Sequence, residues 1–326
     1  MEREHQQALH DEQERAIIEH EEQREQLDRQ RREREKTERK QREEQRLLQL
    51  RLDLLNYDFH KCPRIKKEAF QNLEVDDIDL IRIALIGPTG SGKTSLVGTL
   101  QRAIGENQTA FEQGTGKEGN IILEEYFVQN NIRIVHTRGF FARDEKLQDE
   151  VLDIMTGRIR LGEEIKRDYD DPVKQSAGDE FQELNTVARK TAAFSNYIHA
   201  VILVLKANDP RLEEGIYRGT LQNIRDHFRT HGIYPVTVIT FLDMLKAEEV
   251  KKKASEEAGL ATGGPGGRTY FITNYTHENN KTSFAVERTA LDILDSALVS
   301  AESFIRIRKQ RERNQMEREA MAGGNV

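Results

Sequence analysis

The fold is decided by the stretch Leu85, Ile86, Gly87, Pro88, Thr89, Gly90, Ser91, Gly92, Lys93, Thr94 and Ser95. From Gly87 onward it matches the pattern G-x-x-x-x-G-K-[ST] of a phosphate-binding loop, or P-loop. The apolar run Ile81–Ile86 before it has the composition of a buried strand, and the apolar residues after it have helical spacing. Because the pattern requires a strand before it and a helix after it, we predict a P-loop here.

Each position of this loop has a chemical role. Gly87, Gly90 and Gly92 let the backbone curl so that its N–H groups point at phosphate oxygens. Lys93 supplies positive charge for the β- and γ-phosphates, and the hydroxyl of Thr94 can ligate Mg²⁺. The N-terminus of the following helix adds a partial positive charge. The alternative is a glycine-rich turn that binds nothing.

The composition narrows the class of protein. The chain has 326 residues, of which 33% are charged, and its net charge of -7 argues against a nucleic-acid binder. Its single cysteine, Cys62, cannot form an internal disulfide, so we expect a reducing, cytoplasmic setting. No apolar segment reaches the roughly 18 residues that a membrane span needs. The charged N-terminus also differs from a signal peptide.

Residues 1–57 are predicted to form a charged helix. Acidic residues precede basic ones by four, as in Glu25 with Arg29 and Glu35 with Arg39, and neither Gly nor Pro interrupts residues 1–46. A heptad series starts with Leu9 and Ala16 but then becomes polar, so a solvated helix and a weak coiled coil both remain open. A coiled coil would serve self-association or a protein partner. The apolar residues at the end share one helical face and are expected to pack: Leu47, Leu50, Leu54 and Tyr57.

The rest of the chain alternates strand and helix patterns. We expect a connector over residues 58–80, an α/β domain over 81–308, and a charged, disordered tail over 309–326. A helical insertion is expected at about 142–195. Strands predicted at 121–128, 132–135, 200–205, 235–241 and 269–273 join the first strand in a mostly parallel central sheet between two layers of helices. This is the architecture of a GTPase-like P-loop domain.

Four residues are candidates for sensing or cleaving the γ-phosphate. Thr115 and Thr109 lie in a polar, glycine-bearing loop over residues 106–120, although such a loop can also have no such role. Gly139 fits the glycine of the Asp-x-x-Gly motif of P-loop GTPases, but His136 replaces its aspartate. A neutral imidazole could accept a hydrogen bond from a Mg²⁺-bound water without adding negative charge. The alternative is an ordinary histidine at a strand end.

Two further residues are candidates for reading a nucleotide base. Thr240, Phe241, Leu242 and Asp243 stand where GTPases have Asn- or Thr-Lys-x-Asp, whose aspartate accepts two hydrogen bonds from guanine. Asp243 fits, whereas Phe241 replaces the lysine and could stack on the base. A helix-capping aspartate is the alternative for Asp243. Asn274 follows the last predicted strand and could present its amide to the base.

In motif order the chain resembles the interferon-induced protein 44 family. The resemblance is carried by residues 83–95 (IALIGPTGSGKTS), by His-Thr-Arg-Gly at 136–139 and by residues 272–278 (ITNYTHE), and it covers residues 60–308. It implies a Rossmann-like P-loop fold, GTP binding and a role in innate immune responses. His136 departs from the Asp-Thr-x-Gly pattern of that family.

Together these patterns favour a guanine-nucleotide-binding protein, a switch or slow GTPase, with GTP or GDP and Mg²⁺ as cofactors. In this reading Gly87, Pro88, Thr89, Gly90, Ser91, Gly92, Lys93, Thr94 and Ser95 hold the nucleotide, and Thr94 holds the metal. Two alternatives remain. One is an ATP-using P-loop enzyme, and the other is a nucleotide-inert adaptor that acts through its N-terminal helix.

Overall fold

The chain divides into two compact units, residues 1–52 and 53–326. The computed structural model describes residues 2–65, 73–105, 121–141, 146–167, 192–245, 247–264 and 266–323. Helix α1 (Glu2–Leu55) forms the first unit and ends in the second. At 1.5 Å per residue it is about 80 Å long.

The predicted N-terminal helix is thus present. Glu25 pairs with Arg29 as expected, whereas Arg39 pairs with Glu43 instead of Glu35. These pairs are largely exposed to solvent, so each contributes only about 0.3–0.5 kcal/mol. The helix ends at Leu55, before the predicted end at residue 57.

The second unit is built on a six-stranded sheet with the order β2-β3-β1-β4-β5-β6. Its strands are β1 (Ile81–Ile86), β2 (Glu124–Gln129), β3 (Ile132–His136), β4 (Ala200–Lys206), β5 (Val236–Thr240) and β6 (Thr269–Phe271). The β2–β3 pair is antiparallel and every other pair is parallel. The predicted α/β class with a mostly parallel sheet is therefore confirmed. The P-loop follows β1, which lies between β3 and β4 in the sheet. The order of strands changes direction at this point, and open α/β sheets bind their ligands at such a point.

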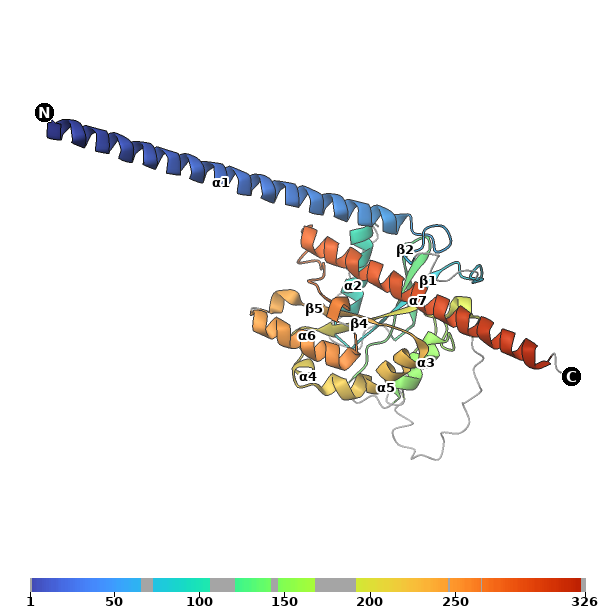
Figure 1. Ribbon diagram of the computed structural model, residues 1–326. Helices are drawn as coiled ribbons and strands as arrows, with labels where there is room; N and C mark the ends of the chain where they lie inside the picture. Colours follow the sequence, from blue (N-terminus) through green and yellow to red (C-terminus); the bar gives the residue numbers. More distant parts are fainter. Residues whose placement is uncertain are drawn as a thin grey trace. The chain divides into compact units, whose positions relative to one another are not determined.

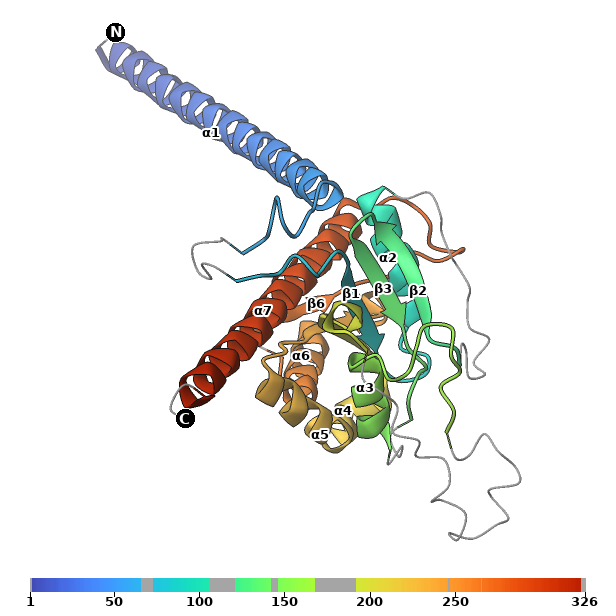
Figure 2. The same cartoon turned by 90° about the vertical axis from the view of Figure 1, so that its right-hand side faces the viewer.

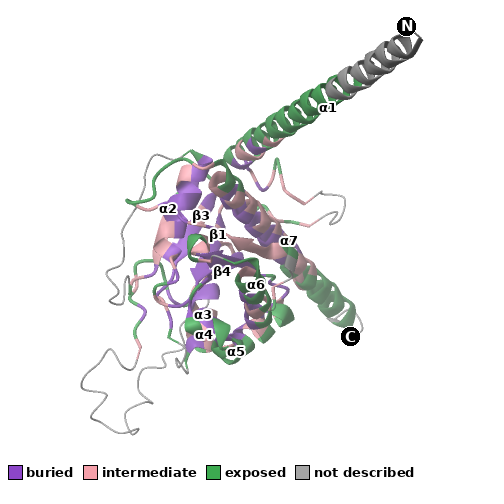
Figure 3. Cartoon of the chain, turned by 90° about the vertical axis from the view of Figure 1, so that its left-hand side faces the viewer, coloured by how far each residue is buried: buried purple, intermediate pink, exposed green. Residues whose placement is uncertain are grey.

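Helices cover both faces of this sheet (Figures 1 and 2). Helices α2 (Lys93–Ile104) and α7 (Phe284–Gly323) lie together on one face. The other face is covered by α3 (Leu147–Met155), α4 (Pro210–Glu213), α5 (Ile216–His231) and α6 (Glu248–Thr262). Short 3-10 turns occur at Phe194–Asn196, Leu242–Met244 and Gly266–Arg268. Figure 3 shows the buried residues concentrated in the central strands, whereas the C-terminal part of α7 is exposed.

The prediction of a disordered tail after Arg308 was wrong, because α7 continues to Gly323. Its charged end has the same spacing that favours helix in α1. Arg308 pairs with Glu312 and Arg313 with Glu317, four residues apart in each case. Residues 324–326 lie outside the described part of the chain.

The insertion expected to be helical over about 142–195 is mostly not helical where it is described. Only α3 and the turn Phe194–Asn196 are helical there. Helix α3 ends just before Gly157, whose φ of 66° favours glycine, and Ile122 then bridges to Glu164 in an extended segment. Residues 142–145 and 168–191 lie outside the described residues. Another predicted helix, over 211–231, is divided at Gly215.

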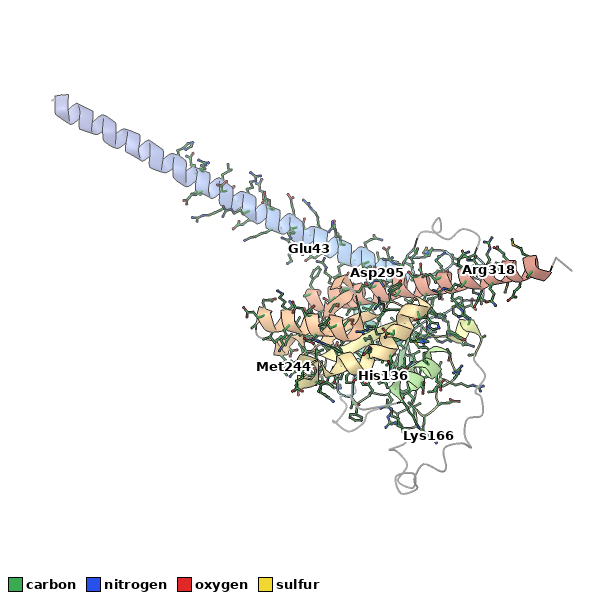
Figure 4. All side chains as sticks on the ribbon, turned by 60° about the horizontal axis from the view of Figure 1, so that its bottom comes forward. Glu43, His136, Lys166, Met244, Asp295 and Arg318 are labelled. Carbon is green, nitrogen blue, oxygen red and sulfur yellow. The ribbon has the colours of Figure 1, made fainter. Side chains whose placement is uncertain are left out.

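The connector after α1 is fastened to α7 by the buried carboxylate of Glu302. Its Oε1 accepts hydrogen bonds from the Tyr57 hydroxyl at 3.0 Å and from the backbone N–H of Arg64 at 2.7 Å. Its Oε2 accepts one from the N–H of Ile65 at 2.8 Å. The guanidinium of Arg64 also pairs with Asp295 of α7, which is labelled in Figure 4. The connector is therefore part of the folded unit.

Replacing Glu302 with glutamine is expected to lower the free energy of unfolding by about 2 kcal/mol. Glutamine has one acceptor oxygen where the carboxylate has two, so one part-buried backbone N–H, that of Arg64 or Ile65, loses its partner. Urea unfolding of the full chain measures this loss. Tyr57→Phe is the matched control with a smaller loss, about 1 kcal/mol, since it leaves both N–H groups paired. Equal free energies of unfolding for Glu302→Gln and wild type would contradict the anchoring role of Glu302.

Candidate functional site

The P-loop backbone is held by close contacts that only glycine allows. A Cβ on Gly87 would lie 2.2 Å from the carbonyl oxygen of Val204 in β4. A Cβ on Gly139 would lie 2.5 Å from Oγ1 of Thr89 and 2.7 Å from its Cα. Backbone hydrogen bonds from Phe140 N to Gly87 O and from Thr89 N to Phe140 O join the same two segments. The segment after β3 is thereby fastened to the phosphate loop.

Some N–H groups of the loop are used by hydrogen bonds within the protein, and the others are free to bind a ligand. Thr89 donates to Phe140 and Ser91 donates to Pro88. Within the described chain, the N–H groups of Gly90, Gly92 and Lys93 make no hydrogen bond. Gly90 and Gly92 have φ values of 78° and 84°, and helix α2 begins directly after them. Three free N–H groups at a helix N-terminus form a site suited to an anion.

The ammonium of Lys93 lies inside this loop. Its Nζ donates to the carbonyl oxygens of Gly87 at 2.9 Å and Pro88 at 3.1 Å, and only 6% of the residue is exposed. Burial, with a smaller contribution from the positive charge of Arg167, lowers the pKa of Lys93 to about 7. No carboxylate among the described residues pairs with Lys93. A buried ammonium without a counter-ion favours the binding of an anion.

The side chain of Thr94 faces His136, at the end of β3 (labelled in Figure 4). Thr94 Oγ1 and His136 Nε2 lie 3.2 Å apart. Burial and the nearby charge of Lys93 lower the pKa of His136 to about 3, so the imidazole is neutral at neutral pH. The other ring nitrogen, Nδ1, is buried and has no hydrogen-bond partner. Thr94 thus meets a neutral ring where an aspartate would bring a negative charge.

A second cluster forms at the other side of the loop, around Gly92. The position of a Cβ on Gly92 is 3.2 Å from Nδ2 of Asn274, 3.3 Å from the Phe241 ring and 3.5 Å from Oγ1 of Thr240. Asn274 donates from Nδ2 to the carbonyl of Gly92 at 3.1 Å, which leaves its Oδ1 buried without a partner. Thr240 donates to the carbonyl of Ser91 at 2.7 Å. Asn274 and the segment before Asp243 are therefore brought to the P-loop, as the motif order requires.

Asp243 lies in the turn Leu242–Met244, whose last residue is labelled in Figure 4. Its side chain is exposed and makes no hydrogen bond or ion pair with the described residues. The turn is joined to the end of β6 by a bond from Leu242 N to Ile272 O. The carboxylate is thus available to a ligand at the surface.

Phe241 adopts the left-handed backbone conformation, with φ of 58°, as no other described residue except glycine does. A conformation of this kind costs of order 1 kcal/mol and often marks a functional position. The ammonium of Lys206, at the end of β4, lies 4.9 Å from the centre of the Phe241 ring. Lys206, from another strand, therefore lies beside Phe241, the residue that replaces the lysine of the GTPase motif.

Sequence reasoning missed Lys206 and Arg167 as members of the site. Lys206 could have been found from the sequence, because it directly follows six buried apolar residues of β4. Arg167 has no such signal: it donates to both carboxylate oxygens of Glu150 and to the carbonyl of Gly139 at 2.9 Å. It is brought beside the loop by tertiary structure alone.

The remaining predicted residues divide into two groups. Pro88, Thr89 and Ser95 lie in the loop and the first turn of α2. Thr109 and Thr115 lie outside the described residues, so their proposed role stays a prediction.

In the described part of the chain, no group of three or more His, Cys, Asp or Glu side chains could hold a metal ion. No described helix is long and apolar enough to cross a membrane.

Comparison with known proteins finds partial similarity to solved structures, of which Toc33 is one example. No protein-family model and no curated protein matches the chain. A dimerization-deficient mutant of Toc33 from Arabidopsis thaliana is 12% identical in sequence, with a TM-score of 0.40. The match covers 69% of this chain and 86% of that chain. The fold and the site are defined by the strand order and the P-loop of the chain itself.

Proposed function

We propose that this protein binds a guanine nucleotide at the P-loop, as a switch or a slow GTPase. The observation that carries the proposal is the buried ammonium of Lys93, which has only carbonyl partners among the described residues, in a loop that also has free backbone N–H groups. Buried polar atoms without partners border the same loop: Ser91 Oγ, His136 Nδ1 and Asn274 Oδ1. Such atoms need a ligand or water to compensate for their burial. A nucleoside polyphosphate offers both phosphate oxygens and base donors.

Guanine is the base that the free polar groups favour. The Asp243 carboxylate accepts hydrogen bonds only, and guanine offers two adjacent donors, N1–H and the 2-amino group. Adenine offers no such pair. The Phe241 ring, held beside Gly92 and next to the Lys206 ammonium, provides an aromatic surface on the same side of the loop. ATP is the alternative nucleotide, motivated by the missing lysine of the motif.

The decisive experiment measures binding of fluorescent GTP and GDP to the full chain, with unlabelled GTP, GDP, ATP and XTP as competitors. We expect only guanine nucleotides to compete well. In Asp243→Asn, guanine affinity should fall by about 30-fold, roughly 2 kcal/mol. The substitution replaces one of the two acceptor oxygens of the carboxylate with an NH₂ donor. Xanthine, which has a carbonyl in place of the amino group, should gain affinity in that variant. Asp226→Asn, an exposed change on α5, is the control and should leave both affinities unchanged.

Equal competition by ATP would support the ATP-using alternative. Absence of all nucleotide binding by a folded protein would favour the adaptor, whose helix α1 exposes Leu27, Leu48 and Leu52 to a partner. We also propose a cytoplasmic protein linked to innate immune responses. The resemblance to the interferon-induced protein 44 family and the single exposed cysteine, Cys62, support this setting.

A further inference from the structure

In a P-loop, the hydroxyl at the position of Thr94 is a direct ligand of Mg²⁺. Here that hydroxyl is 3.2 Å from the imidazole of His136. If the imidazole has its hydrogen on Nε2, it donates to a lone pair of the hydroxyl. If the hydrogen is on Nδ1, the hydroxyl donates to Nε2. The threonine oxygen keeps one lone pair in the first tautomer and both in the second, but in neither does its partner supply negative charge.

The charge around this pair also opposes a divalent cation. Lys93 and Arg167 place two cationic groups by the loop, and Glu150 makes a bidentate pair with Arg167. Glu124, opposite His136 in the β2–β3 pair, already accepts a hydrogen bond from the Tyr126 hydroxyl at 2.6 Å. In P-loop proteins an aspartate helps to hold Mg²⁺, and His136 stands at that position of the motif. The described residues therefore do not fit a Mg²⁺ site, and the expectation that Thr94 ligates Mg²⁺ has no support from them.

We propose that the site binds its guanine nucleotide without Mg²⁺, as the metal-free polyphosphate. This inference rests on the nucleotide binding proposed above. The charge of the phosphates is then compensated by the Lys93 ammonium, by the N–H groups of Gly90 and Gly92, and by the N-terminus of α2. His136 acts as a positioning residue that holds the Thr94 hydroxyl without adding negative charge.

The test compares the affinity of the full chain for fluorescent GDP and GTP in excess Mg²⁺ and in excess EDTA. For the wild type we expect the two dissociation constants to agree within about threefold. His136→Asp restores the missing carboxylate and should bind at least about tenfold more tightly with Mg²⁺ than with EDTA. His136→Asn is the matched control, of the same size as aspartate but neutral, and should remain indifferent to Mg²⁺.

The outcomes separate this inference from the proposed function. Wild-type binding that requires Mg²⁺ overturns the inference and leaves nucleotide binding intact. Absence of binding in both buffers overturns the proposed function together with it. If His136→Asp and His136→Asn both gain the same Mg²⁺ dependence, the charge argument is wrong. Should neither variant fold, the wild-type titration alone decides.

Discussion

Replacing Gly87 with alanine is expected to lower the free energy of unfolding of the α/β unit by about 3 kcal/mol. The new methyl group would lie 2.2 Å from the carbonyl oxygen of Val204 and 2.9 Å from Oγ of Ser91. Because Val204 lies in a central strand, its backbone cannot move aside without disturbing the sheet. A loss of this size lowers the midpoint of thermal unfolding by roughly 10 °C, which calorimetry of the full chain measures. Nucleotide binding should be lost as well.

A second glycine provides the matched control. Gly219 lies within α5, and a Cβ there would meet no atom within 4 Å. Gly219→Ala is therefore expected to stabilise the protein by about 0.5–1 kcal/mol, because alanine is the better helix former. An unchanged midpoint for Gly87→Ala, measured beside a raised midpoint for Gly219→Ala, would contradict the close approach of the loop to β4.

Nucleotide affinity is expected to fall about tenfold for each pH unit between pH 7 and 9, in line with one proton taken up on binding. The pKa of Lys93 is about 7 in the free protein, and bound phosphate stabilises the charged ammonium. Above pH 7 the ammonium must therefore regain a proton when the nucleotide binds. In Lys93→Ala we expect an affinity about 100-fold lower at pH 7, with no such pH dependence. Titration calorimetry in buffers of different ionisation enthalpy measures both.

The nucleotide-free protein should show the opposite trend in stability. Unfolded, Lys93 has its ordinary pKa of 10.5, so between pH 7 and 10.5 the unfolded state binds the extra proton. The contribution of Lys93 to stability therefore rises with pH in that window, by up to about 1.4 kcal/mol per unit. Lys253→Ala, an exposed change on α6, is the control for both trends. A nucleotide affinity that Lys93→Ala leaves unchanged would refute the central role of this ammonium.

Local patterns predicted the parts of the site that are contiguous in sequence. The P-loop, its strand and its helix occur where the spacing of Gly87, Lys93 and the flanking apolar residues placed them. The sheet class also followed from the alternation of strand and helix patterns. In such segments the residue types themselves determine the local structure.

Contacts between distant segments could not be predicted in this way. Lys206 meets the ring of Phe241 only because β4 and β5 are neighbours in the sheet. Arg167 lies beside the loop because it donates a hydrogen bond to the carbonyl of Gly139. No pattern in the sequence predicts that contact. The end of α7 was missed for a different reason: a highly charged segment has the composition of a disordered tail, although its ion-pair spacing stabilises a helix.

The anchor between Tyr57 and Glu302 has a consequence for how the protein is made. The two residues are 245 positions apart, and the ribosome adds about 5–20 residues per second. Tyr57 is therefore synthesised roughly 12 to 50 s before its partner exists. Until then the strands that α7 covers lack this helix, so part of their apolar surface is open to chaperones and to other nascent chains. The helix that closes the domain is thus synthesised after every strand that it covers.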